Sequence, residues 1–131
     1  MKEGNQVPEE LVYKFIADEI DTVPHLEALL MLWNSRPKQW LVDEMAKALY
    51  VPRETSQRIL QELTRRGLIS ASSEPERYSY EHQSEEKDAL LHSLDVIYRR
   101  ELVRVSRMIH AKAPAAVREF ARAFRFTKDK E

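Results

Sequence analysis

The chain has 131 residues, of which 43% are hydrophobic and 33% charged, and its formal net charge is −1 at pH 7. This length suffices for one domain with its own core, and the composition is that of an ordinary globular protein. No apolar run approaches the ~18 residues that a membrane-spanning helix needs, the first ten residues lack the apolar core of a secretory signal, and there is no cysteine. We therefore expect a cytoplasmic protein with no membrane partner, no disulfide and no thiolate metal site.

The first third of the chain predicts two amphipathic helices. After a short tail, Pro8 and the two glutamates that follow it are typical of a helix start. The apolar stripe of this helix is Leu11, Val12, Phe15, Ile16 and Ile20. Asp21 or Thr22 is expected to cap a second helix, with Pro24 in its first turn. Its stripe is Leu26, Leu29, Leu30 and Trp33, and residues 39–41 then predict a minimal strand.

The segment from Asp43 to Ile69 predicts two short helices that meet at a tight turn. Apolar residues at helical spacing are Met45, Ala46 and Leu49 in the first helix, and Ile59, Leu60 and Leu63 in the second. Pro52 suits the first turn of the second helix, and Gly67 suits a left-handed position just after its end. Ala46 and Ser56 are small, as two steeply crossing helices require.

After Gly67 the hydrophobic period changes from 3.6 to two, which predicts a hairpin with a turn at residues 73–76. The order over residues 22–81 is helix, short strand, helix, helix and hairpin. This order resembles the winged helix-turn-helix transcription regulators, with a general layout that is MarR-like or PadR-like. The resemblance implies a mainly α fold with a small β-hairpin wing, and residues 22–81 as a domain that binds double-stranded DNA.

In such regulators the second helix of the pair enters the major groove, which the resemblance implies for residues 53–66 here. The candidate DNA-binding residues on its outer face are Arg53, Thr55, Gln57, Arg58, Gln61 and Arg65. Arginine matches guanine and glutamine matches adenine through paired hydrogen bonds. In the wing, Glu74 and Glu76 would be repelled by phosphate, so a minor-groove contact depends on Arg77 alone. The alternative is that this helix face carries Arg and Gln only because it is solvated.

Residues 84–111 contain no Pro or Gly and predict one helix about 40 Å long. Its apolar stripe is Leu91, Leu94, Tyr98, Leu102, Val105 and Ile109. A small winged domain cannot cover such a stripe alone, so we expect these residues to form the dimer contact of a homodimer. Residues 82–126, which include a last helix near 117–124, form the predicted dimerisation segment. Residues 1–21 are a predicted second dimer contact, and residues 127–131 a disordered tail.

Charge is unevenly distributed, with five Lys/Arg against nine Asp/Glu in residues 1–50 and ten against four in residues 97–131. The basic C-terminal region either approaches DNA or complements the acidic N-terminal region of a second subunit, and we favour the second interpretation.

The sequence thus predicts a homodimeric, sequence-specific DNA-binding regulator of transcription, most simply a repressor. The alternative is a winged protein–protein interaction module, which the acidic wing and the pI of about 6.4 favour. We expect no enzymatic activity and no cofactor, since no catalytic constellation or glycine-rich loop is present. The histidines are His25, His82, His92 and His110. They lack metal-ligand spacing and are expected to face solvent. Trp33 and Trp40 could line a pocket for a small-molecule effector, but we favour the interpretation that both are core residues.

Overall fold

The computed structural model describes residues 7–73 and 76–112. The predicted helix near 117–124 and the predicted disordered tail lie outside these residues. The described elements are α1 (Glu9–Glu19), α2 (Val23–Asn34), α3 (Val42–Leu49), α4 (Arg53–Arg65), β1 (Ser70–Ser72), β2 (Arg77–Ser79), α5 (Glu85–Arg100) and α6 (Leu102–His110). The chain is therefore mainly helical with a small hairpin, as predicted, in a layout compatible with a winged helix. None of the described helices is both long and apolar enough to pass through a bilayer.

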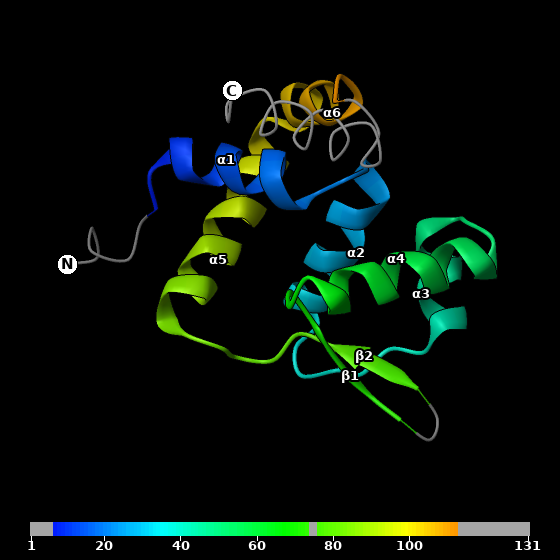
Figure 1. Ribbon diagram of the computed structural model, residues 1–131. Coiled ribbons are helices and arrows are strands. Elements are labelled where there is room, and N and C mark those ends of the chain that lie inside the picture. The colour runs from blue at the N-terminus through cyan, green and yellow to red at the C-terminus, as the bar shows by residue number, and fades with distance from the viewer. Residues whose placement is uncertain (1–6, 74–75, 113–131) are drawn as a thin grey trace, which may run out of the picture.

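Helix α2 is the centre of the molecule, since it contacts α3 and α4 on one side and α5 and α6 on the other (Figure 1). Its start follows the predicted pattern. Thr22 is the N-cap and its Oγ1 accepts a hydrogen bond from the backbone N–H of His25, while Pro24 lies in the first turn. The α3–α4 pair and the hairpin form one end of the molecule, and α1 and α6 form the other.

The α3–α4 crossing confirms the role expected for small side chains. Ala46 and Ser56 are buried, and Ser56 Oγ donates a hydrogen bond of 2.9 Å to the carbonyl of Val42. The turn between the helices places Tyr50 in the left-handed region at φ 60°. A larger residue than serine at position 56 would force α3 and α4 apart.

The end of α4 is a Schellman motif. Gly67 has φ +76°, its N–H donates to the carbonyl of Thr64, and the N–H of Leu68 donates to the carbonyl of Leu63. Because glycine adopts a positive φ without steric cost, Gly67 ends the helix where the sequence predicted.

The hairpin pairs β1 and β2 antiparallel, with Ala71 opposite Tyr78. The strand predicted at residues 39–41 is reduced to a single bridge between Trp40 and Tyr78, with N–O distances of 2.7 and 2.8 Å. This bridge attaches the wing to the segment between α2 and α3. It thereby fixes the wing relative to the helix pair.

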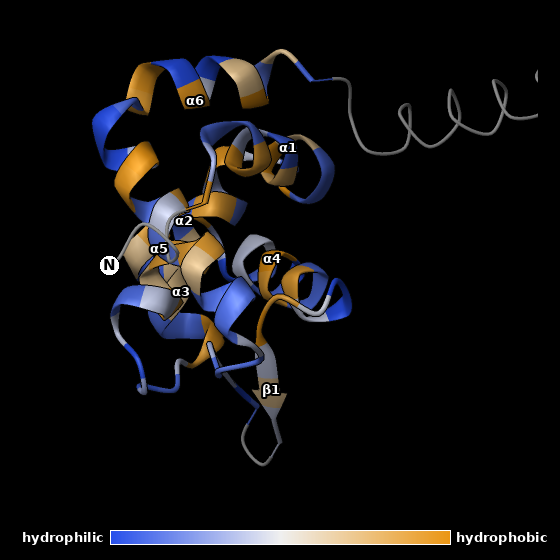
Figure 2. Ribbon diagram, turned by 90° about the vertical axis from the view of Figure 1, so that its left-hand side faces the viewer, coloured by the Kyte–Doolittle hydropathy of each residue, from blue (hydrophilic) through white to orange (hydrophobic). Residues whose placement is uncertain are grey.

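The prediction of one continuous helix over residues 84–111 is wrong. The chain breaks at Glu101, which has φ −121° and ψ 46° and separates α5 from α6. The break lets α6 lie across α1, and both helices show hydrophobic and hydrophilic residues along their length (Figure 2). Burial of both stripes on α1 and α2 outweighs the few helical hydrogen bonds lost at the break.

The break also changes what covers the apolar stripe. Leu91, Leu94, Val105 and Ile109 are buried in the core of the chain itself. Tyr98 is half-buried, and its hydroxyl donates to Glu27 at 3.0 Å. Burial, together with this carboxylate, raises the pKa of Tyr98 to about 12. Leu102 alone of the six expected dimer residues is largely exposed, at 50%. The premise that a second chain must cover the stripe is therefore incorrect. Of the six residues, Leu102 is the one that stays largely exposed for a dimer contact.

Candidate nucleic-acid interface

The outer face of α4 is accessible along its whole length. Arg58, Gln61 and Arg65 are exposed, as the sequence predicted, and Thr55 and Gln57 are half-buried at the edges of this face. The opposite face is formed by buried Ile59, Leu60 and Leu63. The structure thus brings the predicted candidates of α4 together on one continuous surface.

Arg53 begins this surface at the N-terminus of α4. Its Nε donates to Asp43 Oδ1 at 2.7 Å, but both side chains are more than half exposed, at 60% and 68%. Such a surface pair contributes only ~0–1 kcal/mol, so Arg53 can exchange Asp43 for a phosphate at little cost. Pro52 provides no side-chain cap for α4. The first N–H groups of the helix are therefore open to an anion.

Tyr50 is a surface residue that the sequence analysis missed. Its side chain is 94% exposed in the turn that immediately precedes α4. A phenol in this position can donate a hydrogen bond to a phosphate or stack on a sugar. The only signal in the sequence was an aromatic residue directly before Val51 and Pro52, where the first helix of the pair ends.

Arg77 lies on the wing, apart from the α4 face. It is exposed on β2 next to exposed Glu76, whereas the following residue, Tyr78, is buried. Burial and the neighbouring Glu76 raise the pKa of the Tyr78 hydroxyl well above its usual range. The tip residues 74 and 75 lie outside the described part of the chain, so the expected effect of Glu74 stays a prediction.

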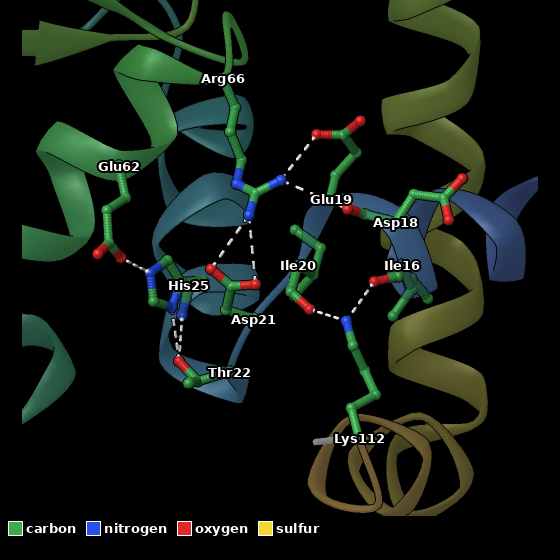
Figure 3. Close-up of polar contacts among 10 residues, drawn as sticks. All are labelled: Ile16, Asp18, Glu19, Ile20, Asp21, Thr22, His25, Glu62, Arg66 and Lys112. Atoms are coloured by element: carbon green, nitrogen blue, oxygen red, sulfur yellow. Dashed lines mark hydrogen bonds and ion pairs between the residues drawn. The ribbon is translucent and has the colours of Figure 1, made fainter. Parts of the chain in front are cut away.

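A cluster of polar side chains connects α4 to α2 through His25 (Figure 3). His25 Nε2 lies 2.6 Å from Glu62 Oε1, and His25 Nδ1 lies 2.6 Å from Thr22 Oγ1. The expectation that all four histidines face solvent is therefore wrong for His25, which is only 6% exposed. Sequence reasoning could not find this contact, because His25 and Glu62 are 37 positions apart and belong to different helices.

Arg66 extends this group to the end of α1. Its guanidinium contacts Glu19 at 3.3 Å and both carboxylate oxygens of Asp21 at 3.3 and 3.4 Å. It also donates to the carbonyl of Asp18 at 3.4 Å. Arg66, the residue that follows α4, is therefore paired with the end of α1 and is separate from the candidate DNA-binding residues.

A second histidine contact lies at the start of α5. His82 Nδ1 is 2.7 Å from Asp88 Oδ2, and the Tyr80 hydroxyl donates to Asp88 Oδ1 at 2.8 Å. The His82 hydrogen bond, helped by Tyr80, holds the pKa of Asp88 below its usual value against the opposing effect of burial. His82 itself remains exposed at 63%.

One pocket of the described structure has neither tryptophan in its wall. This cavity of about 590 Å³ lies between α1 and the start of α5, and its apolar wall includes Leu11, Phe15 and Leu90. Trp33 instead packs edge-on against Tyr80 at 5.1 Å, and Trp40 donates to Ser35 Oγ at 2.8 Å. Trp33 is a core residue and Trp40 is partly buried, in line with the core interpretation of both.

Comparisons with known proteins identify no family. No protein-family model matches the chain, and no curated protein matches it. Among solved structures, the chain is similar to the crystal structure of RV1404 from Mycobacterium tuberculosis, with 19% sequence identity and a TM-score of 0.49. The similarity covers 92% of this chain and 85% of that chain.

Proposed function

We propose that this chain is a winged-helix regulator that binds double-stranded DNA sequence-specifically as a homodimer in the cytoplasm. The observation that carries the proposal is the exposed face of α4, on which Arg58, Gln61 and Arg65 lie together with no described element covering them. Arginine and glutamine are the side chains that best match guanine and adenine in the major groove. Repression of transcription is the simplest outcome of such binding.

The support behind α4 favours this function, because base readout needs a rigid helix. Ser56 bonds α4 to α3, Glu62 bonds it to His25 of α2, and the Schellman motif at Gly67 fixes its end. Ser56 lies on the inner side of α4 and Glu62 at the edge of the outer face, and these contacts leave Arg58, Gln61 and Arg65 exposed. The outer side chains can therefore bind DNA without any rearrangement of the helix pair.

Two copies of α4 would enter successive major grooves about 34 Å apart, which requires a near-palindromic site. The phosphate contacts would come from Arg53, Tyr50 and the open N-terminus of α4. They would position the protein on the duplex without contributing sequence information. Arg77 of the wing is the candidate for a contact in the minor groove.

The test is selection of bound fragments from a random duplex library, followed by anisotropy titrations on the selected site. We expect a palindromic consensus. Arg58→Ala and Gln61→Ala should each weaken specific binding by ~1–3 kcal/mol, or about 5–150-fold. Lys14→Ala is the matched control, since Lys14 is an exposed cation of α1 whose described partner is Asp18, and it should leave the affinity unchanged. Equal affinity of all variants for all sequences would exclude the proposal.

The second candidate is a protein-docking module, which the exposed apolar pair Leu102 and Val103 of α6 favours, at 50% and 63% exposure. Salt separates the two functions. DNA affinity falls steeply between 50 and 200 mM salt on the scale of ~10³–10⁵ for six to ten phosphate contacts, because bound counterions are released. Docking through apolar side chains would barely respond to the same change.

A further inference from the structure

Three potential metal ligands converge behind α4. Asp21 lies between α1 and α2, His25 in the first turn of α2, and Glu62 in α4. One ligand atom from each lies within 4.8 Å of the other two. His25 is buried, and the side chains of Asp21 and Glu62 are 16% and 30% exposed. Figure 3 shows that the three residues come from different elements, so only the folded chain assembles them.

The imidazole of His25 is oriented for coordination. Thr22 Oγ1 lies 2.6 Å from Nδ1, on the side of the ring away from Glu62. When Nδ1–H donates to this hydroxyl, the lone pair of Nε2 is left facing Glu62 Oε1 at 2.6 Å. Histidine ligands of metals are held in this way by a hydrogen bond at the second ring nitrogen.

We propose that Asp21, His25 and Glu62 form a site for a divalent transition-metal ion of the Zn²⁺ class. One imidazole nitrogen and two carboxylate oxygens are a donor set that Zn²⁺ accepts, and water supplies the fourth ligand of an open tetrahedral site. Ligand atoms around tetrahedral zinc lie about 3.3 Å apart, given bonds of about 2.0–2.1 Å. The ion would take the place of the direct contact between His25 Nε2 and Glu62 Oε1.

Two positively charged side chains near this site affect how tightly it can bind a metal ion. Arg66 touches both oxygens of Asp21, and Lys112 Nζ donates to the carbonyls of Ile16 and Ile20 at the end of α1. A carboxylate has lone pairs for a metal and for a guanidinium, so Arg66 can orient Asp21 while Asp21 coordinates the ion. The positive charges also weaken the attraction of the cation. The bound ion should therefore exchange with solution rather than be held permanently.

The proposed ion would join the α1–α2 connection to the inner side of α4. Metal binding would therefore stabilise the attachment of α4 to the rest of the chain by mass action. This inference goes beyond DNA binding and does not depend on it, since the site includes none of the residues proposed to contact DNA.

The experiment is a calorimetric titration of the untagged, metal-free full chain with Zn²⁺, repeated with Co²⁺ as a spectroscopic probe. We expect one ion per chain and the visible absorption of a low-symmetry, near-tetrahedral Co²⁺. Glu62→Gln and Asp21→Asn keep the side-chain size, and each should weaken binding at least about tenfold. Thermal melts without metal show whether each variant folds, and either folded variant suffices. Saturating Zn²⁺ should raise the Tm of the wild-type chain.

His82→Gln is the matched control, because exposed His82 pairs with half-buried Asp88 and, among the described residues, this pair has no third potential metal ligand beside it. Its affinity for Zn²⁺ should equal that of the wild type. Absence of saturable binding would overturn the proposal, as would binding that survives in Glu62→Gln and Asp21→Asn or is lost in His82→Gln. No DNA is present, so this result is independent of the test of DNA binding.

Discussion

The two ends of the molecule use similar apolar stripes in different ways. At the α3–α4 end, the stripe of α4 packs on α2 and α3, and the polar face opposite is left open. At the other end, the stripes of α5 and α6 pack on α1 and α2 after the break at Glu101. Hydrophobic periodicity therefore identifies which face of a helix is buried, but not which element buries it.

The largest effect is expected from Leu94→Ala in α5. Leu94 is fully buried within the chain, so its truncation should lower the free energy of unfolding by ~2–5 kcal/mol. Val96→Ala, two residues further along the same helix, is the control. Val96 is 43% exposed, and its truncation should cost less than ~0.5 kcal/mol. Urea unfolding at two protein concentrations measures both effects.

The dependence of this loss of stability on protein concentration shows whether Leu94 is covered by its own chain or by a second one. If Leu94 belongs to the core of one chain, the loss is the same at low and high protein concentration. A loss that shrinks on dilution would instead show that a second chain covers Leu94, because the stability that an interface adds falls with protomer concentration. That outcome would restore the intermolecular interpretation of the stripe.

An intermediate effect is expected at the α3–α4 crossing. Ser56→Leu inserts three extra carbon atoms where Ser56 is fully buried, and overpacking of this kind costs ~1–3 kcal/mol. Ser56→Ala is the matched control. It loses the hydrogen bond to the Val42 carbonyl but adds no volume, so it should cost no more than about 1 kcal/mol. Equal tolerance of both substitutions would mean that the crossing is looser than the structure shows.

Features of the fold that depend on residues close together in the sequence can be predicted, whereas features that depend on distant residues cannot. The sequence predicted the Thr22 cap and the Gly67 helix end, because both depend on neighbours within a few residues. It also predicted the small residues Ala46 and Ser56, because they depend on a single helix crossing. The break at Glu101 depends on the packing of α6 across α1. No Pro or Gly marks it, so local rules favoured a continuous helix.

The candidate site divides in the same way. The outward direction of Arg58, Gln61 and Arg65 follows from helical periodicity, and the structure places all three on the exposed face of α4. The contact of His25 with Glu62 joins two helices at long range, and no spacing rule encodes it. Tyr50 was missed for another reason, since its exposure depends on a single left-handed residue in the turn.

The smallest effect on folding is expected for the double substitution Leu102→Ser and Val103→Ser in α6. Both side chains are at least half exposed, so the free energy of unfolding should change by no more than ~0.5 kcal/mol per site. The proposed homodimer gives this pair a separate role, because the core of the chain does not bury it and the stripe of Leu94 is already covered. Sedimentation equilibrium should then show self-association at least about tenfold weaker than that of the wild type, a loss of ~1.4 kcal/mol. The control Arg107→Ser changes an exposed residue of the same helix and should leave self-association unchanged. Unaltered association of the double variant would place the dimer contact elsewhere, whereas an unfolded double variant would show that α6 holds more of the core than its exposed residues indicate.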